Sequence, residues 1–120
     1  MKKLVLALLF CSPIAIVLFG DIPVRAQNFS STQPLTRTLN ITSSTVLKAA
    51  QGVLICFNVI TASSGSAGTI NDVATTGAAA TANQIATIPS AVGNYCVTFP
   101  FFTGLVVIPA TNHVISVSYQ

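Results

Sequence analysis

Short runs of β-branched and aromatic residues, separated by turn-forming residues, fill the chain from residue 44 onward. The runs span residues 44–48, 53–61, 68–71, 84–88, 94–99, 104–108 and 114–119. They are too short for typical helices, and their composition favours extended backbone. About seven short strands at near-regular spacing predict one all-β domain, a single antiparallel β-sandwich or a small barrel.

Two connections between these runs can be interpreted in more detail. Residues 109–113 separate the last two apolar runs, and that arrangement predicts a β-hairpin. Residues 73–83 are rich in Ala and Thr without a 3.6-residue apolar stripe, which predicts a surface loop with one or two helical turns. Five residues are predicted as structural turn positions, with the Asp72 side chain bonding local backbone donors. They are Gly68, Asp72, Asn83, Gly104 and Pro109.

The first 26 residues have the pattern of a secretion signal. Lys2 and Lys3 precede an apolar run over residues 4–20, and Val24-Arg25-Ala26 fits a small-residue cleavage site before Gln27. The alternative is an uncleaved membrane anchor, but the apolar run is shorter than the roughly 20 residues that a span needs. We therefore expect an exported protein, periplasmic, at the cell surface or extracellular, with a signal peptide at 1–26, a flexible polar arm at 27–43 and the β-sandwich at 44–120.

Charge is scarce outside the signal segment. The full chain carries five Lys or Arg and two Asp or Glu, but only Arg37, Lys48 and Asp72 follow residue 26. No basic patch remains for nucleic acid, and membrane contact is expected only through the signal segment. A soluble monomer usually carries more surface charge. The composition therefore favours a protein that packs beside copies of itself or on a larger particle; a small-molecule ligand cannot be named from it.

Two cysteines, Cys56 and Cys96, follow the signal segment. Period-two alternation places Cys56 on the face of Leu54 and Asn58, opposite the aromatic face of its strand, and Cys96 on the corresponding face of another strand. In an oxidising compartment they can form a disulfide, which by the chain-entropy model stabilises the fold by about 4 kcal/mol. The alternative is a pair of buried free thiols.

The side chains that most chemistry needs are missing. Beyond the signal segment there is one carboxylate side chain, Asp72, and one imidazole, His113, which alternation places on the core face with Ile115 and Val117. A Cys–His pair is formally available, and a calcium ion at Asp72 is a bare hypothesis. No Cys or His spacing fits a zinc site, and no Gly-rich loop fits a phosphate. We expect no catalytic residues, no metal and no cofactor.

Aromatic residues gather near the end of one predicted strand. Alternation places Tyr95 and Phe99 on the core face with Val97. Phe101 and Phe102 are adjacent, so one of them must point away from the core if the strand continues. These two residues are the candidate contact residues, for assembly or for a carbohydrate.

Six short motifs follow one another between residues 52 and 119. They are Gly52-Val53-Leu54, Gly68-Thr69-Ile70-Asn71-Asp72, Asn83-Gln84-Ile85-Ala86-Thr87-Ile88-Pro89, Phe99-Pro100-Phe101, Gly104-Leu105-Val106-Val107-Ile108-Pro109 and Val117-Ser118-Tyr119. Their order resembles small tailed-phage and prophage virion proteins of the head-fibre or decoration type. The resemblance implies a β-rich, capsid-associated fold without catalytic residues, and it implies that the partners are copies of the protein itself or other envelope or virion-like proteins. The export signal and the two cysteines depart from that family and suggest a prophage module adapted to an oxidising compartment.

These observations predict a non-enzymatic, exported structural or surface module that acts through assembly or adhesion. The alternative is a pilin-like fimbrial subunit in which residues 27–43 are donated as a strand, which predicts a domain that lacks one strand. A secreted enzyme is a third and weaker hypothesis because acid–base residues are missing.

Overall fold

The computed structural model describes residues 34–120, so the predicted signal peptide (1–26) and residues 27–33 of the predicted arm lie outside the described residues. The described part contains eight strands, two short 3₁₀ turns and no α-helix. The elements are β1 (Thr36–Ile41), β2 (Thr45–Lys48), β3 (Gly52–Thr61), β4 (Gly68–Asp72), η1 (Thr76–Ala78), η2 (Thr81–Asn83), β5 (Gln84–Ile88), β6 (Gly93–Phe101), β7 (Leu105–Ile108) and β8 (Val114–Tyr119). The predicted all-β class is confirmed.

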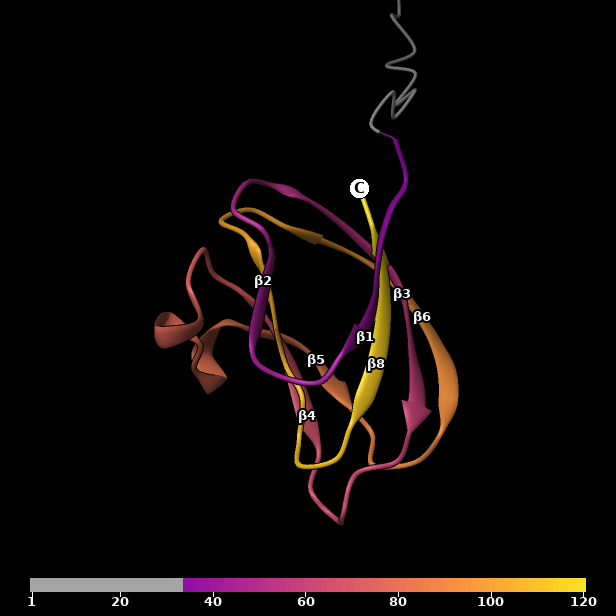
Figure 1. Cartoon of the computed structure of the whole chain (residues 1–120). Coiled ribbons are helices and arrows are strands. Elements are labelled where there is room, and N and C mark those ends of the chain that lie inside the picture. The colour runs from indigo at the N-terminus through magenta and orange to yellow at the C-terminus, as the bar shows by residue number, and fades with distance from the viewer. Residues whose placement is uncertain (1–33) are drawn as a thin grey trace, which may run out of the picture. The chain divides into compact units, whose positions relative to one another are not determined.

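The strands form two antiparallel sheets that face each other as a β-sandwich (Figure 1). The first sheet has the order β1-β8-β3-β6 and the second sheet the order β2-β7-β4-β5. Strands β4 and β5 are the only pair of consecutive strands, among those described, that are hydrogen-bonded to each other. The chain otherwise crosses between the sheets at every connection, and this strand order is that of an eight-stranded jelly roll.

The predicted hairpin at the end of the chain is wrong. β7 pairs with β2 and β4 in the second sheet, whereas β8 pairs with β1 and β3 in the first. Residues 109–113 therefore bridge the two facing sheets instead of reversing the chain within one sheet. Facing sheets lie only about 10 Å apart, so a five-residue loop suits either connection. The strand and loop pattern does not distinguish the two.

The predicted boundary between arm and domain is also wrong. β1 lies within the segment assigned to the flexible arm, yet it pairs with β8 from Thr36 opposite Tyr119 to Ile41 opposite Ile115. Ile41 is 4% exposed and belongs to the core. The segment resembles an arm in sequence because most of its residues are polar, and only the pairing with β8 shows that Ile41 is buried.

The core lies between the sheets and takes residues from both. Its members are fully or almost fully buried apolar side chains. They are Ile41, Leu54, Phe57, Val59, Ile70, Ile88, Phe101, Leu105, Val107, Ile115, Val117 and Tyr119. The hydroxyl of Tyr119 donates to the backbone oxygen of Leu47 at 3.1 Å, so its polar atom is satisfied at the core boundary. In β8 the alternation holds from Ile115 to Tyr119, as expected for a strand buried on one face.

β-Bulges shift the alternation in β3 and β6. Leu54 pairs with Tyr119 and Cys56 pairs with Ser118, so β3 has one extra residue relative to β8. Leu54 and Phe57 both enter the core, and the prediction that Cys56 shares a face with Leu54 is wrong. Since a bulge adds one residue to one strand, every side chain beyond it changes face relative to simple alternation.

The bulge in β6 lies at Thr98, which has a positive φ of 44°. Tyr95 stacks on Phe57 with ring centroids 5.2 Å apart, and its predicted place on the core side is confirmed. Val97 and Phe99 are 41% and 47% exposed, so their predicted burial is wrong. Among the strands of residues 34–120, β6 lies at the edge of its sheet and none pairs with its outer side.

Candidate functional site

The loop between β6 and β7 is held by one carboxylate. Oδ2 of Asp72 accepts the backbone N–H of Phe102 at 2.9 Å, and Oδ1 accepts the N–H groups of Thr103 at 2.7 Å and Gly104 at 3.1 Å. The partners are 30 to 32 residues away along the chain. The prediction that Asp72 bonds local backbone donors is wrong, because its three donors belong to a loop that is distant in the sequence.

The same contacts set the ionisation of Asp72. Burial alone would raise the pKa of this carboxyl group, but the N–H groups of Phe102, Thr103 and Gly104 outweigh burial and hold the pKa below its ordinary value. Three of the roughly four lone-pair positions of the Asp72 carboxylate accept backbone N–H groups of one loop. The arrangement therefore favours a structural role over the calcium hypothesis.

We expect the charge of Asp72 to stabilise the fold at neutral pH and to stop doing so in acid. Its folded-state pKa lies below the unfolded value of about 3.9, so the stabilisation is complete above that value and is lost as the pH falls through the folded pKa. Asp72→Asn should lower the free energy of unfolding by about 1–3 kcal/mol at pH 7. Urea titrations of both proteins at pH 7, 5 and 3 should show the difference shrinking in acid; a pH-independent difference would contradict this role.

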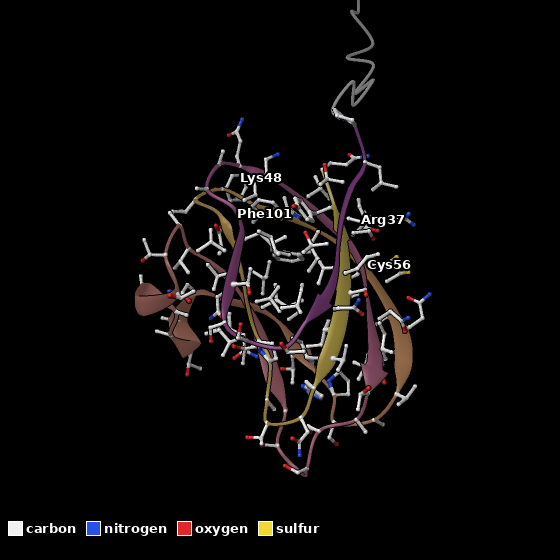
Figure 2. The ribbon with its side chains drawn as sticks, in the orientation of Figure 1. Arg37, Lys48, Cys56 and Phe101 are labelled. Atoms are coloured by element: carbon white, nitrogen blue, oxygen red, sulfur yellow. A yellow bond between two sulfur atoms is a disulfide. The ribbon has the colours of Figure 1, made fainter. Side chains whose placement is uncertain are left out.

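The loop decides which of the two candidate contact residues is exposed. Phe101 is 1% exposed and lies between the sheets, whereas Phe102 is 75% exposed (Figure 2). Phe101 pairs with Gly52, and a Cβ on Gly52 would come within 2.6 Å of the Phe101 ring. The ring of Phe101 is therefore packed in the core, whereas the carboxylate of Asp72 binds the backbone N–H of Phe102. Phe102 is an exposed ring on a fixed loop.

The segment between β4 and β5 packs on the outer side of the second sheet (Figure 1). The Nδ2 group of Asn71 donates to the oxygen of Ala80 and to Oδ1 of Asn83, both at 2.9 Å. Asn83 in turn accepts the N–H of Ala80 and donates to the oxygen of Ala78, again at 2.9 Å. This network holds η1 and η2 and confirms the predicted loop with two helical turns. Asn71, 2% exposed, was not singled out as a site from the sequence.

The other predicted turn residues have varied roles. Gly68 opens β4 instead of lying in a turn, and a Cβ there would come within 2.7 Å of the Ile108 backbone oxygen. Gly104 precedes β7, where a Cβ would lie 2.5 Å from the backbone oxygen of Val73. Pro109 directly follows the last residue of β7. The glycines thus serve close backbone approach, a requirement that their sequence positions alone do not reveal.

Cys56 and Cys96 form a disulfide between directly opposed residues of β3 and β6, with Cα atoms 4.0 Å apart. Both side chains lie on the outer face of the first sheet, and Cys96 is exposed. The disulfide is consistent with an oxidising compartment. Ser118 supports the neighbouring bulge, because its Oγ accepts the N–H of Cys56 at 3.2 Å and donates to the Cys56 oxygen at 3.1 Å. No sequence signal identified Ser118, because its role depends on the bulge.

His113 directly precedes β8 and is 1% exposed, as its alternation with Ile115 predicts. Its Nδ1 accepts the backbone N–H of Ala110 at 3.2 Å, and its buried Nε2 has no partner among the described residues. The contacts of His113 and of Asp72 involve different loops, and both cysteines are bonded to each other. The described residues therefore do not assemble the Cys–His pair that the sequence formally offered.

Two surveys of the described residues and three comparisons with known proteins complete the description. Within residues 34–120, no three His, Cys, Asp or Glu side chains gather where they could hold a metal ion. In the same part of the chain, no helix has the length and apolar character to cross a bilayer. Comparisons with protein-family models, curated proteins and solved structures gave no match.

Proposed function

We propose that this chain is a non-enzymatic, exported structural or surface module that acts through protein–protein assembly or adhesion. The observation that carries the proposal is the exposed ring of Phe102 on the loop that Asp72 fixes. Aromatic residues dominate binding energy at many interfaces. A ring on a preorganised backbone loses little conformational freedom when it docks, so more of its contact energy appears as affinity.

The scarcity of charge supports the same proposal. The described residues carry only Arg37, Lys48 and Asp72 as charged side chains, and Asp72 is used inside the molecule. Charged residues are depleted at the centres of protein interfaces. A surface of Ser, Thr, Asn and Ala with a few exposed apolar side chains is therefore suited to contact with another protein.

The architecture supports the virion-like part of the proposal by analogy. Jelly rolls occur in viral capsid subunits as well as in lectins. A fold hosts many functions, so this support is additional to the Phe102 loop and does not replace it. Export is supported by the signal pattern of residues 1–26 and by the disulfide between Cys56 and Cys96. We infer a phage-derived module that works outside the cytoplasm.

We do not extend the proposal to a pilin-like subunit. That alternative requires residues 27–43 to be donated to another subunit and the domain to lack a strand. Instead, β1 pairs with β8 of its own chain and contributes Ile41 to the core. A strand that already completes its own sheet would have to be withdrawn, at the cost of its hydrogen bonds, before it could be donated.

Removal of the Phe102 ring tests the proposal. We expect the protein to self-associate in sedimentation velocity over a concentration series, and Phe102→Ala to weaken that association at least about tenfold, as for an interface hot spot. The control is Val92→Ala, because Val92 is an apolar residue of similar exposure, 62%, in the connection between β5 and β6. It should change association less than about twofold. A protein that stays monomeric throughout would refute self-assembly, and a Phe102→Ala variant that associates normally would refute the role of the Phe102 ring.

A further inference from the structure

The outer face of the first sheet carries an open groove of about 330 Å³, away from the Phe102 loop. Its shape follows from side-chain size. Strand β8 places the short side chains of Ser116 and Ser118 in the floor, while β1 places Arg37 and Leu39 along one side. Next to this floor, strand β3 contributes Asn58 and strand β6 contributes Asn94. The sequence analysis did not identify this groove, because its lining residues come from four strands.

The groove is built from two rows of side chains that run across the strands. One row places Arg37 opposite Ser118, Ser118 opposite Cys56, and Cys56 opposite Cys96. The next row places Ser116 opposite Asn58 and Asn58 opposite Asn94. Figure 2 shows Arg37 and Cys56 on the outer side of the sandwich, away from Phe101 in the core. A cation therefore lies at one side of a surface of hydroxyl and amide groups.

The hydrogen-bonding groups of the groove are available to a ligand to different degrees. The hydroxyl of Ser118 is already bonded to the backbone of Cys56. The hydroxyl of Ser116 is buried in the groove and has no partner among the described residues. Buried polar atoms are nearly always satisfied, by protein or by a bound group. Asn58 and Asn94 are both exposed, and each amide offers two donors and one acceptor.

We propose that this groove binds an acidic sugar unit, with its carboxylate on Arg37 and its ring hydroxyls on Asn58 and Asn94. A guanidinium matches a carboxylate in a two-point contact, and amide side chains match neighbouring hydroxyls. Arg37 is the one charged side chain in the groove lining. No aromatic ring faces the groove, since Phe57 lines it while its ring is stacked on Tyr95 on the core side. Binding would therefore depend on the contact between Arg37 and the sugar carboxylate, and not on an aromatic ring stacked against a neutral sugar.

The dimensions favour a sugar over an extended peptide. Two rows of side chains correspond to about 7 Å along the strands, since each residue advances about 3.4 Å. That length accommodates one sugar ring with its carboxylate. An extended peptide that ran along the strands would cover only about two residues there, and an extended peptide gains most of its affinity from main-chain pairing at a sheet edge, not on a sheet face. The site is independent of the Phe102 loop and of the assembly proposed for it.

Chemical-shift titration of the purified protein tests this assignment. We expect glucuronate to shift the side-chain amide signals of Asn58 and Asn94, with a Kd on the order of 1 mM for so open a site. Glucose, which has the same ring without the carboxylate, and acetate, which has the carboxylate without the ring, should each bind at least about tenfold more weakly. A glucuronate-containing polymer should shift the same signals. A higher apparent affinity for the polymer than for glucuronate would indicate a glycan-bound sugar instead of a free one.

Matched variants identify the groups that act. Arg37→Gln should weaken glucuronate binding at least about tenfold, and Arg37→Lys should weaken it less because the charge remains without the two-point geometry. Lys48→Gln removes the other cation of the described region, which lies outside the groove lining, and should change the Kd less than about twofold. Phe102→Ala should leave the Kd unchanged even where it abolishes self-association.

Four results would overturn the assignment. They are no saturable shift at Asn58 or Asn94, equal binding of glucose, equal binding of acetate, and tighter binding of a short acidic peptide than of glucuronate. Equal binding of glucose would remove the role of Arg37. Equal binding of acetate would leave only an anion site, and tighter peptide binding would make the groove a protein contact.

Discussion

Loss of the disulfide is expected to lower the free energy of unfolding by about 4 kcal/mol. The bond joins residues 40 apart, and the chain-entropy model assigns about that value to a loop of this length, because the crosslink restricts the unfolded chain. A small domain is usually stable by only about 5–15 kcal/mol, so roughly a quarter to four-fifths of that stability would be lost. The measurement is urea unfolding of the Cys56→Ala, Cys96→Ala double variant, compared with the oxidised protein.

The neighbouring pair in the same two strands provides the matched control. Asn58 is directly opposite Asn94, on the same outer face and one row away from the disulfide, but without a covalent bond. Replacing both by Ala should cost less than about 1 kcal/mol, as for an ordinary cross-strand pair. Reduction of the unmodified protein should reproduce the result for the cysteine variant. If reduction changes the stability by less than about 1 kcal/mol, the disulfide is not a main source of stability.

The second large effect separates two adjacent phenylalanines. Phe101→Ala should cost about 3–5 kcal/mol, because removing a buried ring loses its burial and leaves a cavity. Phe102→Ala should cost less than about 0.5 kcal/mol, because this ring is 75% exposed. Both substitutions remove the same atoms one residue apart, so each variant is the control for the other.

Denaturant unfolding of the two variants, followed by circular dichroism, measures the difference directly. Equal destabilisation by the two substitutions would contradict the orientation of this loop. The result also bears on the proposed function, since Phe102 can serve as a contact residue only if its removal leaves the fold intact. The assembly experiment then reports on the interface and not on unfolding.

Several features of the fold could be predicted because they depend on neighbours in sequence. The seven runs of β-branched and aromatic residues correspond to β2 through β8, and the alternation of His113 with Ile115 identified the buried side of β8. The two cysteines were placed opposite the Phe57 side of β3, and they are bonded there. Each of these predictions uses only the period of two residues that every strand imposes on its side chains.

Features that depend on pairing were predicted less well. Alternation was carried through Ile55 as if β3 were regular, but a bulge there places both Leu54 and Phe57 in the core. Thr36 to Ile41 looked like a polar arm until its pairing with β8 was visible. The candidate contact site was predicted only in part. Because Phe101 and Phe102 are adjacent, the sequence indicated that one of them faces outward, but not which one.

The sequence by itself determined the all-β class, most of the strands, the disulfide partners and the scarcity of charge, because each of these is encoded in residue types and short spacings. The tertiary structure alone decided the jelly-roll order, the bulges, the hydrogen bond between Asp72 and Phe102, which lie 30 residues apart, and the groove beside Arg37. The physical reason is that a strand's periodicity specifies two faces but not its neighbours. Pairing between distant strands selects those neighbours, and a single inserted residue then reverses which face is buried.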